Sequence, residues 1–145
     1  MSRRIARQAA LFALYSYSMR GETDAAQCRP SKKNSLFKDC LEISENDFKF
    51  ARKLFDKALS GKEQIDEIIQ YVSTNWDIDR ISVIDKNIIR LALTEFLFFP
   101  EIGDKVTINE SIELAKDFGG EDSSRFINGI LDAVISKNIG VGKVE

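Results

Sequence analysis

The side chains whose type and spacing could do chemistry are arginines near the start of the chain. Arg7 stands four positions after Arg3 and three after Arg4, so a helix there would bring three guanidinium groups to one side of its exposed first turns. Such a cluster can bind phosphates or stack on unpaired nucleobases. Positive charge at a helix N-terminus also opposes the helix dipole, a small cost that an anionic ligand would remove. The pattern favours an anionic partner.

The overall charge at first argues against a nucleic-acid partner. The 145 residues carry 21 Lys and Arg against 23 Asp and Glu, a net charge of −2. The first twenty residues, however, hold four arginines and no acid, so they carry +4 and the rest of the chain −6. A basic end on an acidic body indicates an anionic partner, and chance at a chain terminus is the competing explanation.

The absence of histidine excludes several kinds of site. Ser-His-Asp and Cys-His catalytic units, His-ligated zinc and His-ligated haem are impossible without an imidazole. Nothing in the sequence brings a pair of the candidate acids into a cleft; these acids are Asp77, Asp79, Glu121 and Asp122. Gly119-Gly120 precedes a helix but lacks the Lys-Ser/Thr of a phosphate-binding loop. We therefore expect no enzyme, metal or cofactor.

Cysteine usage and hydropathy bear on the cellular compartment. Cys28 and Cys40 lie twelve positions apart in a polar stretch and define neither a zinc site nor a disulfide framework. The start imitates a secretory signal, but its apolar stretch, residues 9–15, is at the lower length limit for one. No apolar run is long enough to span a bilayer. We expect a cytoplasmic protein with no membrane partner.

Helical periodicity dominates the elements that must position these residues. A first helix is expected over Arg4 to Met19, apolar nearly all round and therefore buried. Residues 20–43 are polar and read as a variable loop, with a short helix around Leu36 to Leu41. A capping box at residues 44–47 predicts a second helix that ends at Gly61, and a core stripe from Ile65 to Trp76 predicts a third.

Three further helices are expected in the second half of the chain. A capping box at residues 82–85 opens a buried helix that runs to Phe99, and another at residues 107–110 opens a short helix ended by a left-handed cap at Gly119. Asp122 or Ser123 caps the last helix. No strand pattern competes. The prediction is one domain over residues 1–145, an all-helical bundle of about six or seven helices.

Three segments carry a resemblance to a known family. Residues 6–15 (ARQAALFALY), preceded by arginines, resemble the opening helix of the transcription antitermination factor NusB family. Residues 85–95 (DKNIIRLALTE) resemble its central helix. Residues 108–132 (INESIELAKDFGGEDSSRFINGILD) are similar to the family signature almost throughout. The resemblance covers the chain apart from the loop at 20–43 and the last few residues.

The resemblance implies an RNA-binding adaptor without catalysis, folded as two packed three-helix units. Members bind the boxA element of ribosomal-RNA leaders as single-stranded RNA, together with a ribosomal protein that doubles as NusE. The complex helps RNA polymerase pass terminators. The resemblance leaves a homodimer open.

By the same resemblance, particular positions acquire expected roles. Those expected to bind RNA are Arg3, Arg4, Arg7, Tyr15, Phe118, Asp122, Arg125 and Phe126. Those expected to face NusE are Asp79, Asp85 and Arg90. Spacing alone would place Phe118 and Phe126 in the core, and Asp122 would serve equally as a helix cap. Ile5 interrupts the arginine run, so RNA affinity is expected to depend more heavily on the partner protein.

Two other functions compete. One is the NusB-like domain of a ribosomal-RNA cytosine methyltransferase, which needs a further catalytic domain that 145 residues do not accommodate. The other is a protein-interaction or membrane-surface module that uses the basic start without RNA specificity. An interfacial helix should have a broad polar face, and the first helix lacks one.

Overall fold

The computed structural model describes residues 3–40, 42–73 and 78–137. Across these residues the chain forms seven α-helices and three short 3₁₀ helices, with no strand, which confirms the predicted all-helical bundle. The α-helices are α1 (Arg4–Met19), α2 (Ala25–Cys28), α3 (Glu45–Ser60), α4 (Lys62–Val72), α5 (Val83–Phe98), α6 (Asp104–Phe118) and α7 (Ser123–Ser136). The 3₁₀ helices are η1 (Ser35–Phe37), η2 (Ile78–Arg80) and η3 (Pro100–Ile102).

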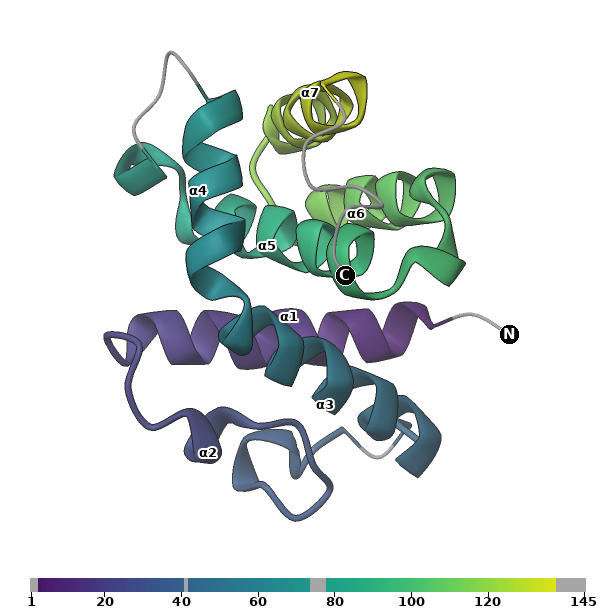
Figure 1. Cartoon of the computed structure of the whole chain (residues 1–145). Helices are drawn as coiled ribbons and strands as arrows, with labels where there is room; N and C mark the ends of the chain where they lie inside the picture. Colours follow the sequence, from purple (N-terminus) through teal and green to yellow (C-terminus); the bar gives the residue numbers. More distant parts are fainter. Residues whose placement is uncertain (1–2, 41, 74–77, 138–145) are drawn as a thin grey trace.

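The helices pack as two groups that meet at α5 (Figure 1). One group holds α1, α2 and α3, and the other holds α4 to α7, with α5 in contact with α1, α3, α4, α6 and α7. Eleven consecutive residues of α5, from Asn87 to Leu97, are buried. The predicted burial of this helix is confirmed, and its central place follows from an apolar surface that covers most of its circumference.

The first helix is less buried than its pattern predicts. Its alanines together with Leu11 and Leu14 face the core, but Ile5 and Phe12 are 38% and 43% exposed. The expectation of a helix buried all round is therefore wrong, because α3 and α5 cover α1 without enclosing that side. Exposed apolar side chains that lie near one another on a helix face indicate a binding surface.

Helix starts agree with the capping patterns in part. Ser44 and Asp47 form the predicted box, in which the Ser44 Oγ accepts from the Asp47 N–H at 3.1 Å. The Ser82 Oγ likewise accepts from the Asp85 N–H at 3.2 Å. The predicted box at Thr107 is wrong, because α6 already begins at Asp104 and Thr107 lies inside it.

The turn between α6 and α7 also differs from the prediction. Gly119 has φ −90° and ψ −178°, so it ends α6 in an extended conformation and not through a left-handed cap. Neither predicted side-chain cap of α7 forms: Asp122 makes no capping bond, and the Ser123 Oγ instead accepts from the Gly120 N–H at 2.8 Å. A short turn closed by its own serine hydroxyl thus joins the two helices.

The loop at 20–43 contributes to the core more than a variable surface loop would. It contains α2 and η1, and it buries Cys28 and Phe37 completely or nearly so. The Phe37 ring meets the rings of Phe12 and Phe48 edge to face. The expected helix over Leu36 to Leu41 is replaced by η1, and position 41 lies outside the described residues.

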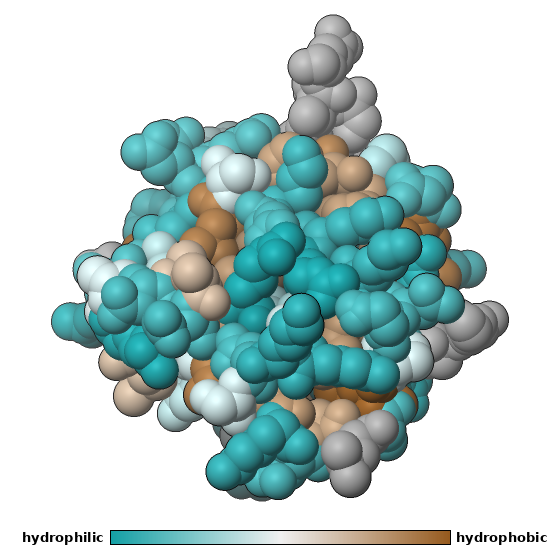
Figure 2. Space-filling model, turned by 90° about the horizontal axis from the view of Figure 1, so that it is seen from below, coloured by the Kyte–Doolittle hydropathy of each residue, from teal (hydrophilic) through white to brown (hydrophobic). Residues whose placement is uncertain are grey.

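Two further observations concern the cysteines and the surface. Burial raises the pKa of the Cys28 thiol, which suits an inert core residue. Seen from the side of α2 and α3, the surface is largely hydrophilic with smaller hydrophobic areas between (Figure 2). None of the helices in the described part of the chain has the length and hydropathy to cross a membrane.

Candidate nucleic-acid and protein interface

The predicted arginine cluster is divided among three different partners. Arg3 is exposed, and its guanidinium carbon lies 4.1 Å from the centre of the Phe50 ring on α3. Arg4 is exposed and donates two hydrogen bonds to Glu110 on α6, at 3.1 and 3.0 Å. The hydrogen bond from Arg4 holds the pKa of Glu110 below its ordinary value. Of the three arginines in the predicted cluster, Arg3 and Arg4 reach the surface.

Arg7 is buried, which corrects the expectation of an exposed guanidinium. Only 5% of the residue is exposed, and it donates to both carboxylate oxygens of Glu95 on α5, at 2.7 and 3.2 Å. Thr107 on α6 donates to the same carboxylate at 2.7 Å. The physical reason is that a buried charge is stable only when paired and hydrogen-bonded, and here three helices supply the partners. Arg7 therefore joins α1 to α5 and α6.

The aromatic residues near the α6–α7 turn differ in exposure. Phe118, the last residue of α6, is 49% exposed, whereas Phe126 on α7 is partly buried and packs against the core. The core expectation from spacing is thus wrong for Phe118. Tyr15 is half-buried, and it lines the same small cavity as Phe118. Arg125 and Asp122 are exposed.

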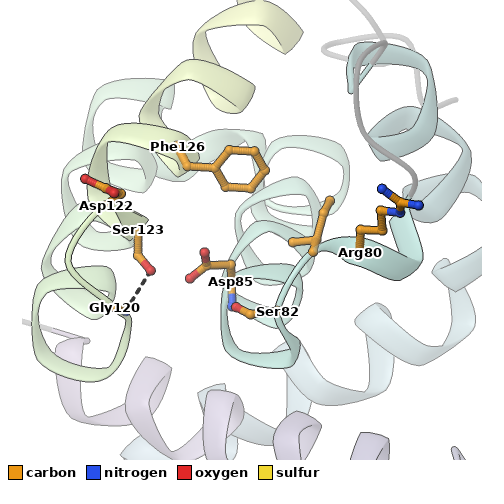
Figure 3. Close-up of a pocket in the computed structure, with 8 residues that line it drawn as sticks. Arg80, Ser82, Asp85, Gly120, Asp122, Ser123 and Phe126 are labelled. Carbon is orange, nitrogen blue, oxygen red and sulfur yellow. Dashed lines mark hydrogen bonds between the residues drawn. The ribbon is translucent and has the colours of Figure 1, made fainter.

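A larger hollow lies between the start of α5 and the start of α7, with a volume of about 500 Å³. Asp85, Ser123 and Phe126 point toward its middle, and Arg80 and Asp122 lie at opposite ends (Figure 3). The Oδ1 atom of Asp85 is buried and has no hydrogen-bond partner among the described residues. The hollow thus brings two residues expected to bind RNA beside one expected to face NusE.

The other positions expected to face NusE lie in different environments. Asp79 is exposed in η2. Arg90 is only 7% exposed, and it donates two hydrogen bonds of 2.9 Å to Asp66 on α4 and a third, of 3.2 Å, to Asn87. The expected role would place Arg90 on the molecular surface, but the structure buries it. The side chain instead fixes α4 against α5.

Several residues of the site escaped the sequence reasoning. Glu95, Thr107 and Glu110 hold the arginines of α1, and Gln8 and Phe12 line the small cavity. The spacing of four between Gln8 and Phe12 indicated a shared helix face, but not the neighbour of that face. Of the candidate acids, Asp79, Glu121 and Asp122 are exposed, and Asp77 lies outside the described residues. No three potential metal ligands gather within the described ranges.

Comparison with known proteins decides the family. The model of the NusB family matches residues 4–136. The chain belongs to the NusB family. A curated relative, the transcription antitermination protein NusB of Desulfitobacterium hafniense, is 42% identical over 135 residues, which cover 93% of this chain and 88% of the relative.

Solved structures of NusB proteins share the fold. T. maritima NusB superposes with a TM-score of 0.81 at 32% identity, over 94% of this chain and 92% of that one. A structure of the antitermination factors NusB and NusE in complex with double-stranded RNA gives a TM-score of 0.81 at 26% identity, over 93% and 96% of the two chains. The NusB fold therefore extends over the helices that carry both candidate surfaces.

Proposed function

We propose that this chain is a non-catalytic transcription antitermination factor that binds boxA RNA of ribosomal-RNA leaders together with NusE. The complex would act in the cytoplasm and help RNA polymerase pass terminators. Membership of the NusB family supports this proposal, as does the similar solved structure that contains NusB, NusE and double-stranded RNA. The chain's own surface supplies the rest of the argument.

The exposure of Phe118 is the observation that carries the RNA part. An aromatic ring that is 49% exposed at the end of a helix contributes little to the core, but it offers a face on which an unpaired base can stack. Tyr15 lines the same cavity, and Arg4 lies on the same helix as Tyr15, nearer the start of the chain. Arg3, Asp122, Arg125 and Phe126 complete the proposed RNA surface.

Arg7 contributes to RNA binding in a different way from Arg3 and Arg4. Its guanidinium is held inside the protein by Glu95, so we propose that it positions α1 and makes no phosphate contact. At the start of α1 only Arg3 and Arg4 then remain to contact phosphates, which predicts weak binding by the protein alone.

The proposed NusE surface centres on Asp85 and Asp79. The Asp85 carboxylate oxygen that no described residue hydrogen-bonds lies beside a hollow and suits a basic or amide side chain of a protein partner. Arg90 supports this surface from inside, because its bonds to Asp66 hold α4 beside α5. An acidic body that repels nonspecific RNA would leave specificity to the joint complex.

The RNA part is tested by removing the ring that carries it. Phe118→Ala should weaken binding of boxA RNA by about fivefold or more, since stacking on an aromatic side chain contributes roughly 1–3 kcal/mol per base. Tyr71→Ala is the matched control, because Tyr71 is 63% exposed but lies on α4. Equal RNA affinities for the two variants, measured by fluorescence anisotropy, would contradict the proposed RNA surface.

A further inference from the structure

A small apolar slot opens between α1, the start of α5 and the end of α6. Its volume is about 100 Å³, and its lining residues are Gln8, Leu11, Phe12, Tyr15, Ile84 and Phe118. Buried Leu11 and partly buried Ile84 contribute apolar surface to its lining. The slot is separate from the hollow beside Asp85, because none of the described residues lines both.

Two of the aromatic residues in the slot are unusually open to solvent. Phe12 is 43% exposed and Phe118 is 49% exposed, and they come from different helices. Phe37 meets the Phe12 ring edge to face, with a centroid distance of 5.5 Å, which fixes the orientation of that ring. Rings held on two sides of a small apolar opening suit a flat aromatic guest better than a peptide helix, which needs a long groove.

Gln8 contributes a polar side chain to the lining of the slot. Its carboxamide is partly exposed and makes no hydrogen bond to any described residue. Arg4 precedes Gln8 by one turn and Phe12 follows it by one turn, so the three side chains share a face of α1. A nucleotide on this face would meet a guanidinium, a carboxamide and an aromatic ring in succession.

We infer that Gln8 determines specificity for one unpaired base of the bound RNA, by reading the edge of an adenine held in the slot. The inference rests on the proposed function and names a residue and a base within it. A carboxamide presents a donor and an acceptor side by side, which match N7 and the N6 amino group of adenine. Guanine presents two adjacent acceptors, O6 and N7, at the same positions, so the carboxamide oxygen would face an acceptor instead of a donor.

The test compares base preferences of the unaltered protein, Gln8→Ala and Gln8→Glu, each with NusE and a set of boxA RNAs substituted one position at a time. The unaltered protein should prefer adenine over guanine at one position by about tenfold. Gln8→Ala should abolish that preference. Gln8→Glu should move it toward guanine, because a carboxylate accepts from both N1–H and the N2 amino group on the Watson–Crick edge of guanine. Gln64→Ala, an exposed glutamine on α4, is the matched control and should change nothing.

The possible outcomes separate this inference from the proposed function. Adenine-to-guanine ratios that stay the same in Gln8→Ala and Gln8→Glu, with RNA still bound, overturn the assignment of the slot alone. A loss of NusE affinity in Gln8→Ala without RNA would assign the slot to the protein partner and also overturn it. Failure of the unaltered protein to bind boxA RNA in the presence of NusE overturns the proposed function, and this inference with it.

Discussion

At the scale of single residues, the buried ion pair of Arg7 and Glu95 is the contact on which the site most depends. Replacing one partner leaves the other as a buried charge without compensation. Arg7→Met should therefore lower the free energy of unfolding by about 3–5 kcal/mol, measured by urea titration. The Thr107 bond to Glu95 would remain but cannot replace a guanidinium.

The double variant Arg7→Met/Glu95→Met provides the control. Two apolar side chains of similar length should recover most of the lost stability, apart from about 1–3 kcal/mol for the Thr107 hydroxyl that loses its acceptor. If the double variant is as unstable as the sum of the two single variants, the destabilisation does not arise from the unpaired charge.

The exposed pair of Arg4 and Glu110 places a carboxylate in competition with RNA phosphate. Glu110→Gln should raise the affinity for boxA RNA, by up to about fivefold, because it releases the charge that holds Arg4. Glu67→Gln, an exposed acid on α4, controls for the change in net charge. An equal gain in both variants would show that bulk charge, not Arg4, is responsible.

The same pair gives the folded protein a pH dependence in the acid range. Arg4 lowers the pKa of Glu110 below its ordinary value of 4.5, so the pair stabilises the fold above that pH and loses its effect as the pH falls through the lowered pKa. Glu110→Gln should consequently lose less stability than the unaltered protein when the pH falls from about 6 to about 3. Parallel unfolding curves at the two pH values check this.

At the scale of elements, the turn from α6 to α7 requires glycine at one of its two glycine positions. A Cβ on Gly119 would lie 2.6 Å from the Cβ and Oγ of Ser123 and 2.8 Å from the Ala115 carbonyl oxygen. A Cβ on Gly120 would meet nothing closer than the Ser123 Oγ at 3.9 Å. Gly119→Ala should destabilise the protein by about 1–3 kcal/mol through overpacking, and Gly120→Ala should be close to neutral.

This pair of variants also tests the link between the turn and the RNA surface. Gly119 directly follows Phe118, so a shifted turn should move the exposed ring and weaken boxA binding under conditions where the variant remains folded. Loss of stability in Gly120→Ala equal to that in Gly119→Ala, by thermal unfolding, would contradict the close approach to Ser123.

Helix positions could be predicted from the sequence because each is encoded locally. Apolar periodicity and the Ser44 cap predicted α3, and the stripe from Ile65 predicted α4. The capping pattern at Thr107 failed because its hydroxyl finds a tertiary partner, Glu95, and the helix continues through it. Local patterns do not record such partners.

The candidate site could be predicted only in outline, for the same reason. The resemblance indicated which positions to examine, but not that Arg7 is buried or that Arg90 binds Asp66. Both ion pairs join residues far apart in the sequence, and spacing along one helix carries no information about them. Gln8 was missed because the slot exists only once α5 and α6 meet α1.

At the scale of the whole molecule, the charge distribution and the fold both indicate that the chain contributes one part of the RNA surface and NusE the rest. Two exposed arginines at the start of α1 belong to an otherwise acidic protein with a net charge of −2. The proposed NusE surface lies at the hollow between α5 and α7, close to the α6–α7 turn that carries Phe118. A partner bound there would extend the RNA surface, which accounts for weak binding alone and tighter binding in the complex.

Joint recognition of RNA by this chain and NusE is tested most directly by a titration of boxA RNA and of a scrambled RNA of equal length, each with and without NusE. We expect weak binding of both RNAs by the protein alone, and a gain of about tenfold or more with NusE for boxA only. The salt dependence should be modest, with a slope of about 0.7 per phosphate neutralised. Equal affinity for boxA and scrambled RNA in the presence of NusE would contradict joint recognition.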